Sequence, residues 1–277
     1  MPEGDVLFVA AKKLAAVLTG RVITRFESPL PELKERDVEG HVVKAVRAHG
    51  KHVIIELDDG RALLSFLRMQ GKWFASEKAD MRQRLLEKTA RDVAWDNEET
   101  TLIIETETSV AVLSRAAIAQ LAPLEKIERR LASLGPDLLS TDYDQAEVMA
   151  RLREHPDLTV AEALIKQSIV AGIGNVYKSE TLFIEKVSPF VAVGALDDAT
   201  LERLLTRARQ LMRRNLKGPR RTTFGTFAGS AYFVYERSGQ HCLKCDTKIR
   251  MLRQGPLQRS TYFCPECQPE QQHQLGP

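Results

Sequence analysis

The sequence has few cysteines, no long apolar run and almost no net charge. Its four cysteines all fall between residues 242 and 267, which excludes a disulfide framework spread along the chain. No apolar stretch approaches the roughly 18 residues of a membrane helix, and the N-terminus lacks the basic-then-apolar pattern of a secretory signal. We therefore expect a cytoplasmic protein with no membrane partner. The 277 residues are enough for two domains and a small further module.

The formal net charge of +3 does not by itself indicate a nucleic-acid-binding protein. Basic residues nevertheless gather between residues 203 and 221, namely Arg203, Arg207, Arg209, Arg213, Arg214, Lys217, Arg220 and Arg221. Such a cluster is typical of a face that binds a polyanion, but a solvated helix surface can have the same composition. Charge alone leaves both interpretations open.

The first half of the chain has the pattern of one helix followed by strands. Apolar residues recur at helical spacing over residues 5–18, and Gly20 then marks the end of the predicted helix. Short segments rich in β-branched residues follow at 42–50, 51–57, 61–67 and 100–113, with a hairpin turn at Asp59–Gly60. The chain up to about Gly135 is therefore predicted to form a mainly antiparallel sheet domain.

The second half is predicted to be helical and to end in a small module. Candidate helices cover residues 158–167, 176–185 and 198–216, and the glycine-containing turn SIVAGIGN separates the first two. Residues 135–144 have the composition of an interdomain linker, and the last ten residues lack any apolar periodicity. We expect that tail to be disordered.

The cysteines are spaced C-x2-C-x18-C-x2-C, at Cys242, Cys245, Cys264 and Cys267. Two pairs at this spacing can close a tetrahedral thiolate shell around Zn²⁺, and such a closed site is structural rather than catalytic. Two disulfides are the alternative, which a cytosolic chain disfavours. The residues between the pairs predict a β-hairpin with Arg250, Arg253 and Arg259, which can grip phosphates.

The chain begins Met-Pro-Glu-Gly-Asp, and methionine before a small residue is commonly removed. Removal would leave Pro2 with a secondary amine, and an α-amine has an ordinary pKa of about 7.7–8.0. Such an amine can attack a sugar C1′ near neutral pH and form an iminium ion, with Glu3 next to it as a proton shuttle. The plain alternative is that Pro2 and Glu3 merely begin the first helix.

Four segments occur in a characteristic order: MPEG, GKHVIIEL, KQSIVAGIGNVYKSETLF and QRSTYFCPEC. Over residues 2–268 the chain thereby resembles the Fpg/Nei family of DNA glycosylases, which comprises formamidopyrimidine-DNA glycosylase and endonuclease VIII. The resemblance implies an α+β multidomain fold with an N-terminal β-sandwich and flanking helices, a helix–two-turn–helix domain and a C-terminal zinc-ribbon β-hairpin. The boundaries we expect are 1–135 for the catalytic domain, 136–148 for a linker, 149–228 for the DNA-binding domain, 229–268 for the zinc finger and 269–277 for the tail.

The resemblance also implies roles for individual residues. Pro2 matches the Schiff-base nucleophile of the family and Glu3 its acid/base partner. Lys51 matches a lysine that contacts phosphate beside the lesion, although an ordinary exposed strand lysine would look the same. Met69 matches the side chain that fills the gap left by a flipped nucleotide, for which a core methionine is the alternative.

The remaining predicted DNA contacts lie in the second half. Asn175 is expected to cap the helix that follows it and to leave backbone amides free for a phosphate, although a cap without a ligand is equally simple. Gly172 and Gly174 would permit a tight turn and close approach of DNA. Arg259 matches a zinc-finger arginine that clamps phosphates.

The function implied is that of a bifunctional DNA glycosylase and AP lyase in base excision repair. It would act as a monomer on damaged double-stranded DNA, with one structural zinc ion, and cleave the abasic strand by β,δ-elimination. The start of the chain and the short loop at residues 222–237 are more like endonuclease VIII, which favours oxidised pyrimidines such as thymine glycol and 5-hydroxyuracil.

The sequence departs from the family pattern in several places. Val6 stands where many relatives have glutamate, and Phe66 replaces a histidine. The Arg-Phe pair of the formamidopyrimidine branch is not evident near residues 110–120. These departures leave other functions open: a lyase without glycosylase activity, a non-catalytic protein that binds damaged DNA, or a glycosylase that prefers 8-oxoguanine and formamidopyrimidine.

Overall fold

The computed structural model describes residues 2–34, 37–79, 100–218, 221–224 and 230–269. The chain forms two compact units, Met1–Ser133 and Leu134–Pro277, and each is described by itself. The predicted disordered tail lies outside the described residues except for Pro269. Among the helices described, none combines the length and the apolar character that crossing a bilayer requires.

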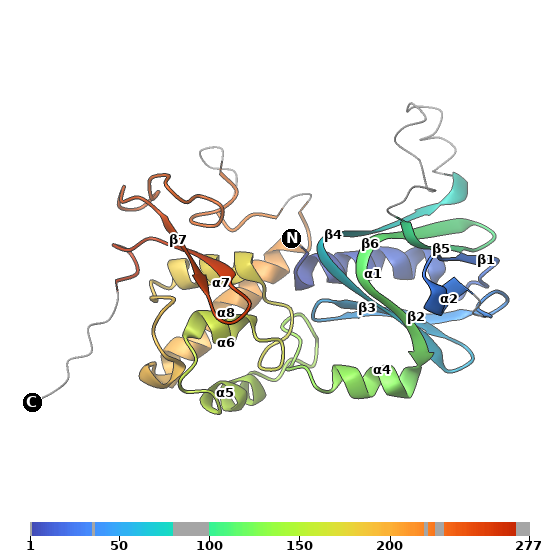
Figure 1. The fold of residues 1–277 in the computed structure, drawn as a ribbon, viewed down its shortest axis with the longest axis horizontal. Coiled ribbons are helices and arrows are strands. Elements are labelled where there is room, and N and C mark those ends of the chain that lie inside the picture. Colours follow the sequence, from blue (N-terminus) through green and yellow to red (C-terminus); the bar gives the residue numbers. More distant parts are fainter. Residues whose placement is uncertain (1, 35–36, 80–99, 219–220, 225–229, 270–277) are drawn as a thin grey trace, which may run out of the picture. The chain divides into compact units, whose positions relative to one another are not determined.

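The first unit places one long helix against an antiparallel sheet (Figure 1). Its helices are α1 (Gly4–Leu18), α2 (Pro31–Lys34) and α4 (Leu124–Leu131). Its strands are β1 (Arg25–Glu27), β2 (Val43–His49), β3 (His52–Leu57), β4 (Arg61–Glu77), β5 (Thr100–Glu105) and β6 (Ser109–Pro123), arranged in the order β1-β5-β6-β4-β3-β2. The expected first helix and both hairpins are confirmed. Helices α2 and α4 and strand β1 were not predicted.

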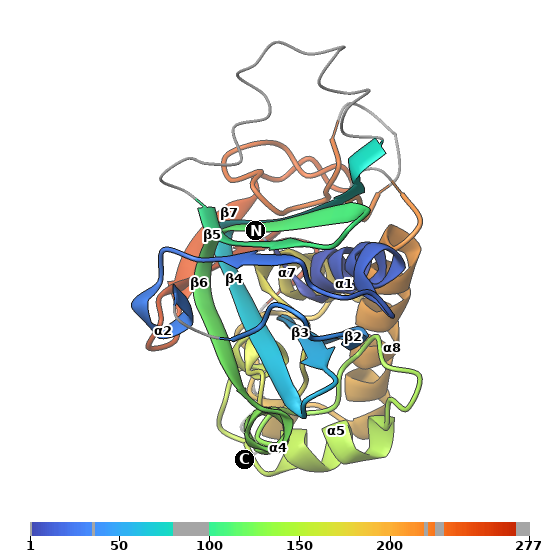
Figure 2. The same ribbon diagram turned by 90° about the vertical axis from the view of Figure 1, so that its right-hand side faces the viewer.

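The helix α1 forms because its apolar residues fall on one face. Leu7, Ala11, Leu14 and Leu18 recur every three or four residues and are all buried, while the lysines between them are exposed. The helix ends before Gly20, whose φ of +78° lies in the left-handed region. Figure 2 shows α1 lying along the sheet, against which it packs through β2, β3 and β4.

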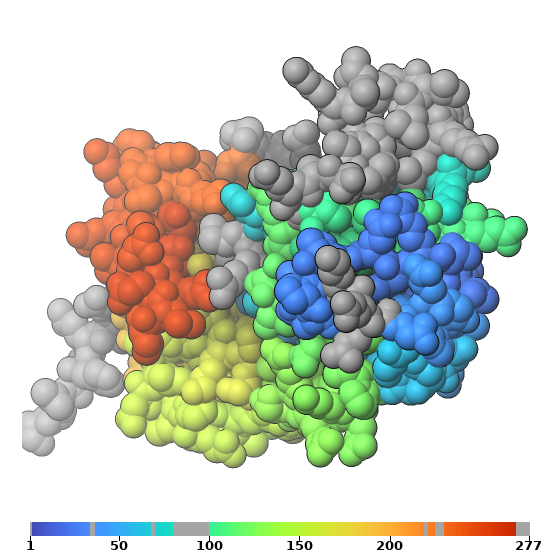
Figure 3. Space-filling model, turned by 45° about the vertical axis from the view of Figure 1, so that its right-hand side comes forward, coloured from blue at the N-terminus to red at the C-terminus, as the bar shows by residue number. Residues whose placement is uncertain are grey.

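The two long strands β4 and β6 divide the sheet into two halves. Their pairing register breaks near Leu67, after which Lys72 pairs with Ser114. Before the break β4 also pairs with β3, and beyond it β6 pairs with β5. Side chains from both halves and from α1 share one hydrophobic core, as the expected sandwich with a flanking helix requires. In Figure 3 the blue surface of the early residues adjoins the green surface of residues beyond 100, in agreement with the pairing of β1 and β5.

The second unit is helical and carries a small two-stranded sheet. It contains α5 (Gln145–Arg153), α6 (Val160–Ile165), α7 (Asn175–Ile184), the short 3-10 helix η2 (Val193–Ala195), α8 (Asp198–Asn215), β7 (Arg250–Gln254) and β8 (Arg259–Phe263). The three expected helices are confirmed, and each of their ends lies within two residues of the predicted position. The α+β class with a helical domain and a terminal hairpin is therefore confirmed.

Residues 136–148, which were expected to form a linker, are in contact with the rest of the second unit. Asp137 forms a parallel bridge with Ala171, and Leu138 is fully buried. The unpredicted helix α5 begins at Gln145, where the side chain of Asp144 accepts two backbone N–H bonds as its cap. The other domain boundaries stay predictions.

Candidate nucleic-acid interface and N-terminal site

The four cysteine sulfurs form a compact cluster at the base of the β7–β8 hairpin. Their Sγ atoms all lie within 4.8 Å of one another. The distances are 3.9 Å for Cys242–Cys267, 3.4 Å for Cys245–Cys264 and 3.5 Å for Cys245–Cys267. A tetrahedral shell with Zn–S bonds of about 2.3 Å separates its sulfurs by about 3.8 Å. The cluster therefore fits a zinc ion, and its four thiolates leave no position for a substrate.

The knuckle at each pair of cysteines has local support. The backbone N–H of Lys244 points at the sulfur of Cys242, at 3.4 Å, and the N–H of Cys267 points at that of Cys264, at 3.5 Å. The cluster also packs against Phe183 at the end of α7. The metal site is thus joined to the helical domain through a hydrophobic contact.

The turn before α7 is stabilised by a residue that the sequence reasoning missed. The side chain of Gln167 donates to the carbonyls of Ile165 and Ile173, at 2.8 and 3.0 Å, and accepts the N–H of Gly172, at 3.1 Å. Gly172 has φ of +106°, which requires glycine, whereas the backbone of Gly174 is extended. The backbone of the turn therefore requires glycine at position 172, whereas the backbone conformation at position 174 does not.

Asn175 was predicted to be the N-cap of the following helix, and this detail is wrong. Gly174 is the cap, with extended backbone, and Asn175 is the first helical residue. The Asn175 amide therefore does not cap the helix but donates to the hydroxyl of Ser260, at 3.4 Å. The N-terminal amides of α7 still point out of the helix, as an anion site requires.

Arg259 is the first residue of β8 and is exposed. Its neighbour Ser260 is the residue that Asn175 contacts, and Lys178 of α7 bonds to Ser260 and Thr261. The structure thus brings two predicted phosphate contacts, Asn175 and Arg259, to one place in the second unit. Arg250 and Arg253 of the same hairpin are also exposed.

A buried carboxylate on α7 was also missed. Glu180 is fully buried and accepts the backbone N–H groups of Phe233, Val234 and Tyr235, at 2.8, 2.8 and 2.9 Å, and the hydroxyl of Thr223. Burial raises the pKa of this carboxyl. Glu180 thereby holds both ends of the short loop at 222–237, of which residues 225–229 lie outside the described part. A glutamate among the apolar residues of α7 was the only available signal.

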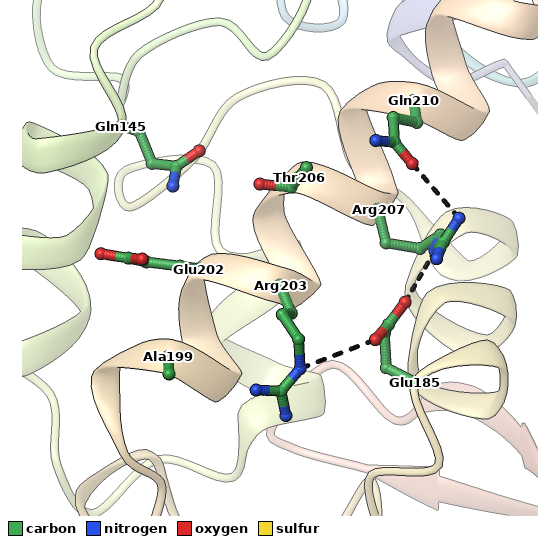
Figure 4. Close-up of a pocket in the computed structure, with 8 residues that line it drawn as sticks. All are labelled: Gln145, Glu185, Ala199, Glu202, Arg203, Thr206, Arg207 and Gln210. Atoms are coloured by element: carbon green, nitrogen blue, oxygen red, sulfur yellow. Dashed lines mark hydrogen bonds and ion pairs between the residues drawn. The ribbon is translucent and has the colours of Figure 1, made fainter.

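Some arginines of the basic stretch at 203–221 are used within the protein, as Figure 4 shows for Arg203 and Arg207 beside Glu185. Glu185 accepts a 2.6 Å hydrogen bond from Arg207 and lies 3.9 Å from Arg203. The guanidinium of Arg209 stacks 4.5 Å over the ring of Tyr143. Arg213, Arg214 and Lys217 are exposed, while Arg220 lies outside the described residues. The stretch is therefore in part structural, through contacts that neither interpretation predicted, and in part an exposed basic surface.

In the first unit Lys51 occupies the two-residue turn between β2 and β3. Gly50 has φ of +56°, and the flanking residues His49 and His52 pair across the strands. The ring of His52 packs on that of Phe66 with 5.2 Å between centroids. Burial, and then the charge of Arg130, lowers the pKa of His52 to about 4, so this imidazole is neutral at pH 7.

The predicted catalytic pair lies at the start of α1. Pro2 is half-buried, and Glu3 is fully buried in the N-cap position with its carbonyl accepting the N–H of Val6, at 2.9 Å. Asp5, in the first turn, is also buried, whereas Val6 is 39% exposed. The positive end of the helix dipole favours carboxylates here. The predicted wedge Met69 lies on β4, but its side chain is outside the described residues.

Three family profiles match consecutive parts of the chain. They are the formamidopyrimidine-DNA glycosylase N-terminal domain at residues 1–113, the formamidopyrimidine-DNA glycosylase H2TH domain at 134–225 and the zinc finger found in FPG and IleRS at 239–269. Together they extend over both units and the cysteine cluster. The match to the zinc finger agrees with the sulfur geometry.

Similar proteins match over nearly the whole chain. A probable endonuclease 8 2 of Streptomyces coelicolor is 36% identical over 97% of this chain and 94% of its own length. A DNA-(apurinic or apyrimidinic site) lyase Nei2 of Mycolicibacterium smegmatis is 34% identical over 97% and 99%. The crystal structure of Lactococcus lactis formamidopyrimidine-DNA glycosylase bound to AP-site DNA has a TM-score of 0.76 at 20% identity, over 97% and 100%. At that identity the structure supports the fold alone.

Proposed function

Because the chain belongs to the family of formamidopyrimidine-DNA glycosylase and endonuclease VIII, we propose that it excises oxidised bases from DNA through a Schiff base at Pro2. It is a DNA glycosylase and AP lyase of base excision repair, as the similarity over 97% of the chain to an endonuclease 8 and an AP lyase indicates. One observation carries the proposal for Pro2: it directly precedes the fully buried carboxylate of Glu3 at the start of α1.

The chemistry begins once Met1 is removed and the Pro2 amine is free. The target nucleotide must leave the duplex, because its C1′ cannot be reached inside the stack. The nitrogen lone pair attacks C1′, the bond from C1′ to the base breaks, and the base leaves with the bonding electrons and takes up a proton. Sugar-ring opening then gives an iminium ion, and Glu3 exchanges the protons that these steps require.

Strand cleavage follows from the iminium ion. Its positive nitrogen makes the C2′ proton acidic, and loss of this proton expels the 3′ phosphate. A second elimination expels the 5′ phosphate, and hydrolysis releases the sugar from Pro2. The product is a one-nucleotide gap with a phosphate at each end.

Residues in both units would hold the damaged double-stranded DNA. Lys51 would contact a phosphate beside the lesion, and Met69 would fill the gap left by the flipped nucleotide. In the second unit Asn175 and Arg259 would bind backbone phosphates, while Gly172 and Gly174 allow the chain to approach closely. The contact of Asn175 with Ser260, beside Arg259, supports a shared role for these two residues.

The cysteine cluster would hold one structural zinc ion, since four ligands from four cysteines complete a single tetrahedral shell. The ion would fix the hairpin that carries Arg259 and would take no part in bond breaking. We also propose that the enzyme works as a monomer in the cytoplasm.

The proposed substrates are oxidised pyrimidines and abasic sites, because the relatives with the higher identity carry endonuclease 8 names. A second candidate is an enzyme that is mainly a lyase. It is favoured by Val6, which stands 39% exposed on α1 where many relatives have a carboxylate, and by the AP-lyase name of one relative.

The test uses duplexes with one thymine glycol, 5-hydroxyuracil, 8-oxoguanine or abasic site, with and without borohydride. We expect a reduced covalent adduct whose digestion assigns the sugar to the Pro2 peptide, and faster cleavage of the two pyrimidine lesions than of 8-oxoguanine. Cleavage of the abasic duplex alone would support the lyase candidate. An adduct on another residue, or active protein that retains Met1, would refute the role of Pro2.

A further inference from the structure

Lys178 is a charged residue in an unusual place. It lies on the first turns of α7 with only 1% of its surface exposed. Its ammonium donates to the carbonyl oxygen of Ser260, at 2.9 Å, and to the hydroxyl of Thr261, at 2.8 Å, both on strand β8. A buried ammonium is costly to desolvate, and these two hydrogen bonds to β8 offset part of that cost.

The contacts around Lys178 connect α7 to the zinc hairpin. One turn earlier, Asn175 donates to Ser260, and the next residue, Ser179, accepts the N–H of Tyr262, at 3.3 Å. Side chains at the start of α7 thus contact three consecutive residues of β8. Figure 1 shows the red hairpin lying against α7.

The far end of the hairpin is also held. Gln254 of β7 donates to the carbonyl of Pro189, at 3.4 Å. Gly255, with φ of +68°, approaches Glu162 of α6 so closely that an added Cβ would lie 2.8 Å from its carboxylate. The hairpin is therefore fixed at its turn as well as along β8, and a shift of β8 along α7 would disturb several contacts.

We infer that Lys178 is a positioning residue that sets Arg259 against the N-terminus of α7, so that Arg259 and Asn175 bind the same stretch of DNA backbone. This inference rests on the proposed function, in which both residues contact phosphates. Lys178 acts through Ser260, the residue that follows Arg259 in the chain. Because it is almost completely buried, its own ammonium has little surface with which to touch DNA.

The test is a double-mutant cycle of Lys178→Met and Arg259→Ala in the full, zinc-loaded chain. Affinity for a duplex with a tetrahydrofuran abasic analogue is measured by fluorescence anisotropy over a range of salt concentrations. We expect Lys178→Met to weaken binding on the order of tenfold, within the range of couplings between contacting residues. In that background Arg259→Ala should cause less than about a twofold further loss.

The salt dependence separates positioning from a general loss of charge. If Arg259 loses its phosphate contact, the plot of the logarithm of the binding constant against the logarithm of the salt concentration becomes less steep. The magnitude of its slope should fall by about 0.9 in Lys178→Met, as in Arg259→Ala. The control Lys186→Met removes the same charge from an exposed lysine just after α7 and should keep the wild-type affinity within about twofold. Full additivity of Lys178→Met and Arg259→Ala, or an unchanged slope in Lys178→Met, would overturn the inference.

Two further measurements keep the result interpretable. If Lys178→Met does not fold with zinc bound, Thr261→Val removes one acceptor and leaves the lysine, and it should show the same non-additivity with Arg259→Ala. Borohydride trapping of the wild type on an abasic duplex tests the proposed function separately. Failure to trap would refute the Schiff-base mechanism, whereas trapping with full additivity would refute only the role of Lys178.

Discussion

The carboxylate of Glu180 accepts the backbone N–H of Val234 at 2.8 Å, although 54 residues separate the two in the chain. The N–H groups of Phe233 and Tyr235 and the Thr223 hydroxyl complete its coordination. These four donors replace the hydrogen bonds that water would give to an exposed carboxylate. The loop between the helical domain and the zinc finger therefore depends on one side chain of α7.

Replacing Glu180 by Gln should destabilise the second unit by about 2–4 kcal/mol, because the amide NH₂ would face a backbone N–H and leave a buried donor unpaired. The measurement is urea unfolding at pH 7. The matched control is Glu154→Gln at an exposed position, which should change the free energy of unfolding by less than about 0.5 kcal/mol. Equal stability of the two variants would contradict the role assigned to Glu180.

The stability of the first unit should depend on pH through His52. Burial lowers the pKa of His52 to about 4 in the folded chain, whereas an exposed imidazole titrates near 6.5. Between these values the unfolded chain binds more protons, so the free energy of unfolding rises from pH 4 to 6.5 and is then constant. The contribution is at most about 3–4 kcal/mol, which is the difference of about 2.5 between the two pKa values at about 1.36 kcal/mol per pKa unit.

This pH dependence is isolated by comparing the wild type with His52→Phe, which retains a ring next to Phe66. The free energy of unfolding of the wild type minus that of His52→Phe should rise as the pH is raised from 4 to 6.5. Other titrating groups cancel in that difference. Parallel curves for the two proteins would show that His52 keeps its ordinary pKa.

Loss of the metal should weaken DNA binding without unfolding the first unit. Cys264 is fully buried in the sulfur cluster, and Cys264→Ser should release zinc because a serine hydroxyl is a poor ligand. We expect affinity for abasic DNA to fall by about tenfold or more as the Arg259 hairpin loses its support. The zinc content of the purified variant checks the release of the ion, and fluorescence anisotropy with abasic DNA checks the affinity. An unchanged zinc content would mean that the cluster does not hold the ion.

Lys51→Met should slow single-turnover cleavage of an abasic duplex and lower the salt slope of binding by about 0.9, the value for one phosphate contact. Lys44→Met, an exposed lysine on strand β2 of the same hairpin, provides the control for loss of charge. We expect Lys44→Met to cleave at the wild-type rate. Equal effects of both substitutions would indicate a general electrostatic contribution instead of a specific contact.

Several features could be predicted because their causes are local. The helix at the start, both hairpins and the helix that follows Gly174 depend on side-chain periodicity and turn residues that lie within a few positions. The exact N-cap could not be predicted, because Asn175 uses its amide on Ser260, 85 residues away. Helices α4 and α5 were missed, since α4 is short and α5 begins inside a segment that resembled a linker.

The sequence by itself determined the family and the four cysteines that cluster, since cysteine spacing and motif order are written along the chain, and it led to the proposal for Pro2. Only the tertiary structure decided which polar groups are buried and what they hold. In the sequence Lys178 and Glu180 look like ordinary charged helix residues. In the structure β8 packs over Lys178, and the loop at 222–237 packs over Glu180. The burial of these two side chains results from contacts with residues more than 40 positions away, and no local pattern records it.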